Sequence, residues 1–203
     1  TASSNILKNY KSPYTATAIQ KLIDAGAIPI CKENCDQFGH GSTNENSVFG
    51  VAKNAHNDDK VAGGSSGGSA VNVAEGNTVF SIGGDTGGSI RQPAGYNKVY
   101  GLKPTYGRVS RYGLMAYTSS SDCVGPFANT VKDIATTLNV MSGKDGKDQT
   151  TLTSTPIDVE SFDSKIKAGT KIGVYKSFID HPSLESKIKT DFNSLIEKLK
   201  EKG

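Results

Sequence analysis

Apolar residues recur along this chain in short segments whose spacing alternates between that of helices and that of strands. Residues 15–25 carry apolar side chains at helical spacing, and Gly26 follows them as a favourable helix stop. The pattern predicts further helices at 70–74, 130–141 and 183–200, strands at 27–31, 78–82, 99–102, 123–124 and 171–175, and a polar surface loop at 144–156. Strands that alternate with helices predict an α/β fold with a mixed, mostly parallel sheet covered by helices on both faces.

The last predicted helix is amphipathic. It carries an apolar stripe made of Ile188, Phe192, Leu195 and Leu199. Such a stripe at helical spacing is typical of a helix face that packs in a hydrophobic core, so we expect core packing here and not a partner-binding helix.

Composition limits the classes of protein to which the chain can belong. A length of 203 residues with 35% hydrophobic residues suits a single domain, and a net charge of +3 is too small to indicate nucleic-acid binding. The chain holds no run of 18 apolar residues, so we expect no transmembrane helix and no membrane partner. Cys31 and Cys35 have C-x₃-C spacing without a second pair, and we therefore expect free thiols and no metal site.

Two glycine-rich loops that contain serine are the most informative motif: Gly63–Ser69 and Gly83–Arg91. Glycine-serine runs are often flexible linkers, but both of these adjoin apolar segments. A phosphate-binding loop is disfavoured because no Gly-Lys-Ser/Thr follows, and the G-x-S-x-G turn of hydrolases is absent around Ser89. The loops therefore indicate one site built from backbone amides and hydroxyls.

A serine hydroxyl is a nucleophile only when a nearby base accepts its proton. A triad with His40 is conceivable, and the alternative is a neutral lysine with a second serine that passes the proton. An acyl-transfer oxyanion needs converging N–H donors, which the second loop offers. The candidate donors are the backbone amides of Thr86, Gly87, Gly88 and Ser89. Asp85 and Arg91 flank this loop and are expected to brace it as a pair.

At these residues the chain resembles the amidase signature family. The resemblance implies that Ser89 is the acyl nucleophile, and that Ser65, which follows a cis peptide bond, relays a proton between Ser89 and a lysine base. It also implies the amidase signature fold, which the chain contains incompletely.

The flanking segments narrow the resemblance. Residues 2–17, 34–47 and 101–114 are similar to the A subunits of glutamyl-tRNA(Gln) amidotransferases. Such subunits hydrolyse glutamine and pass ammonia to a partner that amidates glutamate on tRNA(Gln). The resemblance implies partner subunits B and C, tRNA bound mainly through the partner, ATP and Mg²⁺ used by the partner, and no cofactor in this subunit. It implies a location in the bacterial cytoplasm or an organellar matrix.

Several positions depart from the family pattern. Gly84 stands where a serine is common, and His40 replaces a frequent methionine in a segment expected near the substrate, where His40, Gly41 and Ser42 are the candidate contacts. The family's base lysine lies in a Lys-Asp-Asn segment that this chain does not contain. We therefore expect residues 1–203 to be part of a single amidase domain, truncated at both ends and inactive alone.

Two other functions stay open at this point. One is a stand-alone amidase that acts on a small amide, since such enzymes share the serine loops. The other is an inactive, truncated scaffold. The intact Ser65 and Ser89 argue against the scaffold, and the flanking segments favour the amidotransferase subunit over the stand-alone enzyme.

Overall fold

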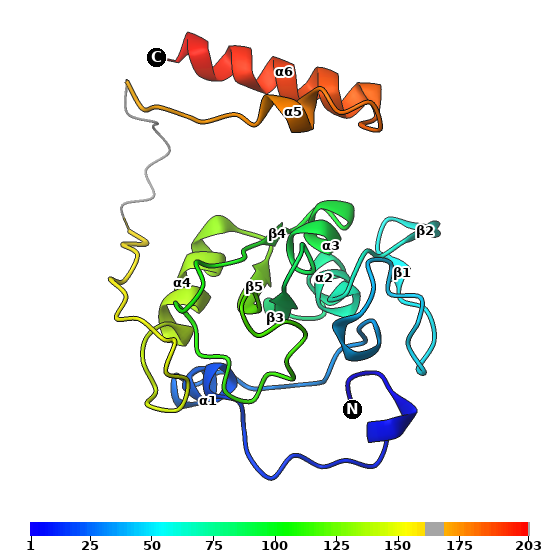
Figure 1. The fold of residues 1–203 in the computed structure, drawn as a ribbon, viewed down its shortest axis with the longest axis vertical. Coiled ribbons are helices and arrows are strands. Elements are labelled where there is room, and N and C mark those ends of the chain that lie inside the picture. The colour runs from blue at the N-terminus through cyan, green and yellow to red at the C-terminus, as the bar shows by residue number, and fades with distance from the viewer. Residues whose placement is uncertain (161–168, 203) are drawn as a thin grey trace. The chain divides into compact units, whose positions relative to one another are not determined.

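The computed structural model describes residues 1–160 and 169–202. The chain separates into two compact units, Thr1–Val159 and Glu160–Gly203. The first unit contains both serine loops and a central sheet (Figure 1).

Three of the described strands form the central sheet in the order β3-β5-β4, with bounds β3 (Phe80–Asp85), β4 (Tyr100–Gly101) and β5 (Cys123–Ala128). Both neighbouring pairs are antiparallel. The expectation of a mostly parallel sheet is therefore wrong for these strands. The reason is that β3 and β4 run in the same direction, joined through α3 (Arg91–Tyr96), but β5 lies between them in the opposite direction. The alternation of helices and strands along the chain predicts that β3 and β4 run in the same direction. It does not predict that β5, a strand later in the sequence, lies between them in the sheet.

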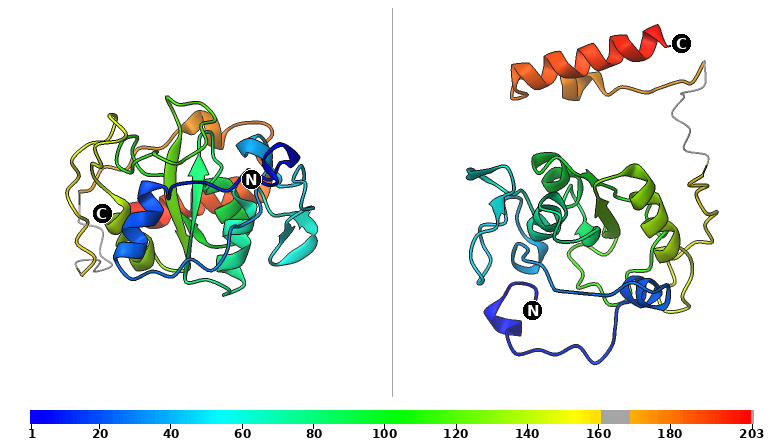
Figure 2. Two further views of the ribbon diagram at one scale, coloured as in Figure 1. Left: turned by 90° about the horizontal axis from the view of Figure 1, so that it is seen from below. Right: turned by 180° about the vertical axis from the view of Figure 1, so that it is seen from behind.

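Helices cover both faces of this sheet, as the sequence predicts (Figures 1 and 2). Side chains alternate between faces along β5, so Val124 and Phe127 point in opposite directions. Val124 packs in the cluster of α1 (Thr17–Asp24) and α4 (Val131–Met141). Phe127 is fully buried in the cluster of α2 (Gly67–Ala74) and α3.

The two long helices of this unit lie close to their predicted positions. The prediction at 15–25 corresponds to α1, and Gly26 follows it with φ +96°, a conformation that favours glycine. The prediction at 130–141 corresponds to α4, whose N-cap Thr130 accepts a hydrogen bond from the Asp133 N–H at 3.0 Å. Local signals were sufficient because both helices combine an apolar face with a clear terminus.

Two predicted strands do not form. Residues 27–31 and 171–175 have no strand partner in the described part of the chain, and Ile28 is 84% exposed. An apolar run becomes a strand only when a second strand satisfies its backbone, and the sequence pattern does not supply that partner. Conversely, the polar hairpin of β1 (Lys53–Asn54) and β2 (Asn57–Val61) has no apolar alternation from which it could be predicted.

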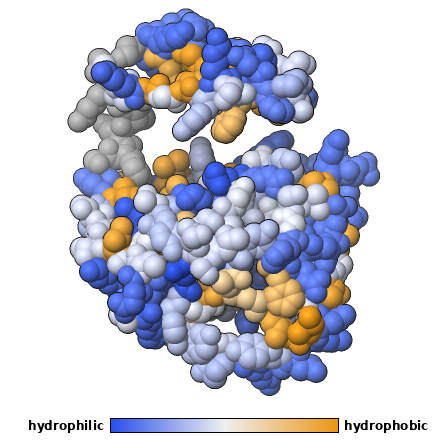
Figure 3. Space-filling view, viewed as in Figure 1, coloured by the Kyte–Doolittle hydropathy of each residue, from blue (hydrophilic) through white to orange (hydrophobic). Residues whose placement is uncertain are grey.

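The second unit contains α5 (Lys176–Ile179) and α6 (Ser186–Glu201). The long helix agrees with the prediction at 183–200, but the stripe on it is not buried: Ile188, Phe192 and Leu195 are 50%, 44% and 49% exposed. Apolar surface is visible on these helices in Figure 3. Within residues 169–202, α5 is a single turn and leaves much of this stripe uncovered, although its own Ile179 is buried. No helix in the described residues is both long and apolar enough to cross a membrane.

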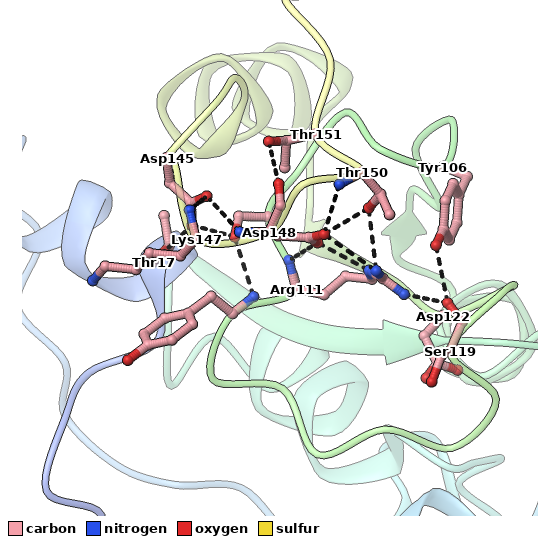
Figure 4. Close-up of polar contacts among 12 residues, drawn as sticks. Thr17, Tyr106, Arg111, Ser119, Asp122, Asp145, Lys147, Asp148, Thr150 and Thr151 are labelled. Carbon is pink, nitrogen blue, oxygen red and sulfur yellow. Dashed lines mark hydrogen bonds and ion pairs between the residues drawn. The ribbon is translucent and has the colours of Figure 1, made fainter.

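The polar segment at 144–156 is a loop, as predicted, and hydrogen bonds anchor it to the rest of the first unit (Figure 4). Asp148 accepts two hydrogen bonds from the Arg111 guanidinium, at 3.0 and 3.2 Å, and a third from the Arg111 N–H at 3.0 Å. Asp145 accepts from the hydroxyls of Thr17, at 2.6 Å, and Ser110. The Arg111 hydrogen bond is the largest of the effects that hold the pKa of Asp148 well below its usual range. These contacts fix the loop against the first residue of α1 and against Ser110 and Arg111, which lie between β4 and β5.

This network predicts a pH-dependent stability. Asp148→Asn should lower the free energy of unfolding by about 1.5–3 kcal/mol at neutral pH, the usual scale for hydrogen bonds to a charged group. The pKa of Asp148 is lower in the folded state, so its stabilisation is complete above the unfolded pKa of about 3.9 and is lost as the pH falls toward the folded pKa. The difference between wild type and variant should therefore shrink as the pH falls from about 5 to about 2 in urea denaturation.

The matched control is Asp58→Asn. Asp58 forms an exposed ion pair with Lys53, and its loss should change the free energy of unfolding by less than about 0.5 kcal/mol. An Asp148→Asn deficit that stays constant across this pH range would contradict the role given to the carboxylate charge.

Candidate active site

The first glycine loop is a buried connection between β2 and α2, not a flexible linker. Residues 62–67 are all buried, and the Gly64–Ser65 peptide bond is cis. The glycines allow other backbone to approach closely: the Gly68 N–H donates to the Asn34 carbonyl at 3.0 Å, and a Cβ on Gly68 would lie 2.5 Å from that oxygen.

Residues 34–44 form the support of this loop. The Asp36 N–H donates to the Ser65 carbonyl at 3.0 Å, and the Asn44 side-chain oxygen accepts from the Gly67 N–H at 3.0 Å. Burial raises the pKa of the Asp36 carboxyl, whose Oδ1 has no hydrogen-bond partner among the described residues. Sequence reasoning missed the roles of Asp36 and Asn44, because a single sequence does not distinguish a buried polar support from an ordinary polar loop.

Asp85 organises the second glycine loop. This carboxylate accepts hydrogen bonds from the N–H groups of Gly88, Ile90 and Arg91 at 2.8, 3.1 and 3.3 Å. The Arg91 guanidinium adds two more, each at 3.0 Å. Burial acts to raise the pKa of Asp85, but the Arg91 and amide hydrogen bonds outweigh it and hold that pKa below its usual value. The Asp85–Arg91 ion pair thus closes the loop on itself.

This arrangement divides the four candidate oxyanion donors. The Gly88 N–H donates to Asp85 and is occupied within the loop. The N–H groups of Thr86, Gly87 and Ser89 have no hydrogen-bond acceptor among residues 1–160 and 169–202. In this part of the chain, three of the four amides are therefore without an acceptor, and the fourth is occupied by Asp85.

Direct hydrogen bonds join the two loops. The Ser66 N–H donates to the Ser89 carbonyl, and the Ser66 hydroxyl donates to the Gly84 carbonyl, both at 3.2 Å. The Gly64 N–H donates to the Gln92 side chain at 3.2 Å. Segments separated along the chain by α2 and β3 consequently form one continuous backbone surface.

A third support reaches the second loop from outside. Asp122, which is 3% exposed, accepts a hydrogen bond from the Thr86 hydroxyl at 2.6 Å and from the N–H groups of Tyr117 and Thr118 at 2.9 and 3.0 Å. Burial acts to raise the pKa of Asp122, but these hydrogen bonds hold it below its usual value. Asp122 therefore connects the glycine loop to the turn at 117–121.

A cavity of about 590 Å³ lies against this surface. Its wall includes Ser65, Thr86, Tyr117 and Asp122. Lys32 also lines the cavity. In the described residues, neither the Ser65 hydroxyl nor the Ser89 hydroxyl forms a hydrogen bond to Lys32. Ser89 is half-buried and is not part of the lining, and its hydroxyl has no hydrogen-bond partner in the described part of the chain. The described residues hold no group of three or more His, Cys, Asp or Glu arranged for a metal ion.

Comparison with known proteins identifies the family. A model described as Amidase matches residues 1–203. The chain belongs to the amidase family. This confirms the resemblance seen in the serine loops, and the solved amidase structures below share the α/β fold.

Individual amidase relatives agree with this result. The chain is 50% identical over its whole length to the glutamyl-tRNA(Gln) amidotransferase A subunit of Acidobacterium capsulatum, of which it covers 42%. The solved A subunit from Thermotoga maritima has a TM-score of 0.75 and 47% identity, over 76% of this chain and 34% of that one. The peptide amidase of Stenotrophomonas maltophilia has a TM-score of 0.71 and 37% identity, over 78% and 33%. The chain thus spans about two-fifths of the curated relative's length.

The predicted substrate contacts of this amidase lie beside the cavity and not in its wall. His40, Gly41 and Ser42 are exposed, and the wall contains the preceding Phe38 and Gly39 instead. The reason is the turn at this segment, where Phe38 and Gly39 both have positive φ.

The His40 ring contacts the Tyr117 ring, with centroids 4.1 Å apart, and its Nδ1 lies 3.0 Å from the Phe38 carbonyl oxygen. Neither serine hydroxyl bonds to it within the described residues. The geometry gives no support to a Ser-His-Asp triad built on His40.

Gly84 illustrates how the fold accommodates a departure from the family pattern. A Cβ on Gly84 would meet only a Leu114 methyl at 3.8 Å, so this position has room for a side chain such as serine. A Cβ on the neighbouring Gly83 would lie 2.7 Å from both Phe127 and the Ser66 hydroxyl. Adjacent residues of β3 face opposite sides, and only the side toward α2 is tightly packed.

This difference predicts opposite outcomes for a matched pair of variants. Gly83→Ala should lower the free energy of unfolding by about 1–3 kcal/mol, because it forces apart Phe127 and the first loop. Gly84→Ala should change it by less than about 0.5 kcal/mol. Urea denaturation of both variants measures the difference, and equal stabilities would contradict the packing described here.

Proposed function

We propose that this chain is the portion of a tRNA-dependent amidotransferase's glutaminase subunit that carries the nucleophile Ser89 and the proton-relaying Ser65. The observation that carries the proposal is the 50% identity to such an amidotransferase polypeptide along the whole chain, with both serine loops in place. The loop geometry supports it, because the Ser66–Ser89 hydrogen bond holds the two serine segments together beside one cavity.

In this proposal the Ser89 hydroxyl attacks the γ-carbonyl carbon of glutamine. Ser65 passes the hydroxyl proton to the lysine base, from which it returns through Ser65 to the departing nitrogen, and the N–H groups of Thr86, Gly87 and Ser89 hold the oxyanion. Collapse of the tetrahedral intermediate breaks the carbon–nitrogen bond and releases ammonia. Water then cleaves the acyl-serine to give glutamate. The base is a lysine outside these 203 residues, as the family resemblance implies.

The proposal extends to partners. We propose that subunits B and C complete the complex, that the partner uses ATP and Mg²⁺ to activate glutamate on tRNA(Gln), and that tRNA binds mainly through the partner. The ammonia formed at Ser89 is then the amide donor. We propose a location in the bacterial cytoplasm or an organellar matrix, where aminoacyl-tRNA is used.

A stand-alone amidase is the second candidate, and the similarity to the Stenotrophomonas maltophilia peptide amidase favours it. The two functions differ in what happens to ammonia. An amidotransferase transfers it to a charged tRNA, whereas a stand-alone amidase releases it to solvent.

The Ser89→Ala variant separates the two steps of the proposed reaction. In the complete polypeptide assembled with its partners, glutamine hydrolysis should fall at least about 10³-fold, because no nucleophile is left. Amidation with added ammonia should continue, since that step belongs to the partner. Ser119→Ala, at an exposed serine, is the control and should retain both activities. Near-normal glutaminase in Ser89→Ala would refute the assignment of the nucleophile.

The Ser65→Ala variant tests the proton relay. Glutamine hydrolysis should fall by about 10²–10⁴-fold, the usual effect of a positioned acid or base. The circular dichroism spectrum and the unfolding midpoint should stay close to those of the wild type, because the loop is held mainly by backbone hydrogen bonds. If activity is lost only together with folding, Ser65 has a structural role and the relay is wrong.

A further inference from the structure

The apex of the second glycine loop is held by little packing. A Cβ on Gly87 or Gly88 would meet no heavy atom within 4 Å, so open space surrounds this part of the backbone. Glycine itself imposes few conformational limits. The free amides of the loop therefore depend on hydrogen bonds at its two ends for their positions.

Asp85 supplies the inner anchor, since it binds the N–H groups of Gly88, Ile90 and Arg91. Asp85 makes no hydrogen bond to Thr86, which is the first residue of the loop after β3. The outer anchor is the 2.6 Å hydrogen bond from the Thr86 hydroxyl to Asp122. The strand register creates this contact: Asp85 pairs with Cys123 at the end of the β3–β5 ladder, and Thr86 and Asp122 are the next residues outward.

Asp122 also holds a second part of the cavity wall. Its other carboxylate oxygen accepts the Tyr117 N–H at 2.9 Å, and Tyr117 lines the cavity beside Thr86. Arg111 contributes a nearby positive charge that favours the ionised carboxylate. A carboxylate accepts stronger hydrogen bonds than a neutral group does, so one side chain fixes both the loop and the wall.

We propose that Asp122 is a positioning residue for acyl transfer, acting through the Thr86 hydroxyl to aim the oxyanion-binding amides at the substrate carbonyl. This inference rests on the function proposed above. Rotation of the unanchored Thr86 backbone moves its own N–H and that of Gly87 together. A displacement of donors or reactants by about 1 Å costs on the order of 10²-fold in rate, because oxyanion stabilisation depends on fixed geometry.

The decisive variant is Thr86→Val, which keeps the volume and every backbone amide and removes only the hydroxyl. In the assembled enzyme we expect kcat for glutamine hydrolysis to fall by about 10- to 100-fold, while KM changes by less than about 2-fold. The free energy of unfolding should fall by no more than about 1.5–3 kcal/mol, the usual scale for a hydrogen bond to a charged group, so the variant should stay folded without urea. Thr86→Ser, which returns a hydroxyl, should recover most of the lost kcat. Thr105→Val, at an exposed threonine, is the matched control and should leave kcat and KM unchanged.

A second variant tests whether the hydroxyl acts through Asp122. Asp122 accepts hydrogen bonds from three donors, the Thr86 hydroxyl and the N–H groups of Tyr117 and Thr118. Asp122→Asn replaces one acceptor oxygen with an NH₂ group, which is itself a donor, so kcat should also fall. If the two side chains act through one hydrogen bond, Thr86→Val should lower kcat by much less in the Asp122→Asn background than in the wild type. Multiplicative effects in the double variant would overturn the proposal. So would a Thr86→Val variant with wild-type kcat, or one whose lost activity is explained by its unfolded fraction.

The Ser89→Ala result distinguishes this inference from the function on which it rests. If Ser89→Ala abolishes glutamine hydrolysis and Thr86→Val leaves kcat unchanged, only the positioning role of Asp122 is wrong. If Ser89→Ala hydrolyses glutamine normally, the proposed nucleophile itself is wrong, and the positioning role falls with it.

Discussion

The Asp85 carboxylate is the interaction on which the second glycine loop depends. A chain rich in glycine has many accessible conformations, and the free energy to select one must come from specific contacts. The Asp85 side chain is fully buried, which makes its charge costly unless donors surround it. The loop supplies three amides, and Arg91 supplies a bidentate guanidinium. These donors stabilise the carboxylate charge, and the same hydrogen bonds hold the loop in one conformation. Among the described residues, the remaining amides at Thr86, Gly87 and Ser89 are left without acceptors.

The antiparallel pairing of β3 with β5 brings the second carboxylate to this loop. The ladder runs from Phe80 opposite Ala128 to Asp85 opposite Cys123, so Asp122 arrives beside Thr86 at the same edge. The inserted strand β5 thus has two roles. It divides the core into two clusters, one on each face, and the residue just before it delivers the support for the loop.

The proposed site consists mainly of backbone, which explains the need for glycine in both loops and for buried polar side chains that support them. Residues 34–44 approach the first loop closely enough to bind the Ser65 carbonyl and the Gly67 and Gly68 amides directly. A Cβ at Gly68 would block this approach. The cost of placing Asp36 under the loop is a carboxyl with a raised pKa and one oxygen without a partner among the described residues. Such a site positions amides and hydroxyls without a metal ligand set in this part of the chain.

Local pattern determined some of the elements and both glycine loops. The helices α1 and α4, the apolar segment between the two serine loops, and the placement of Ser65 and Ser89 beside glycines follow from spacing and residue type alone. Tertiary structure decided which strand lies between β3 and β4, which of four adjacent amides is occupied by Asp85, and that Phe38 and Gly39 face the cavity while His40 does not. It also left residues 27–31 without a strand partner in the described part of the chain. The physical reason is that spacing along the chain records the preference of each segment, whereas strand direction, burial and hydrogen-bond occupancy depend on partners distant in sequence.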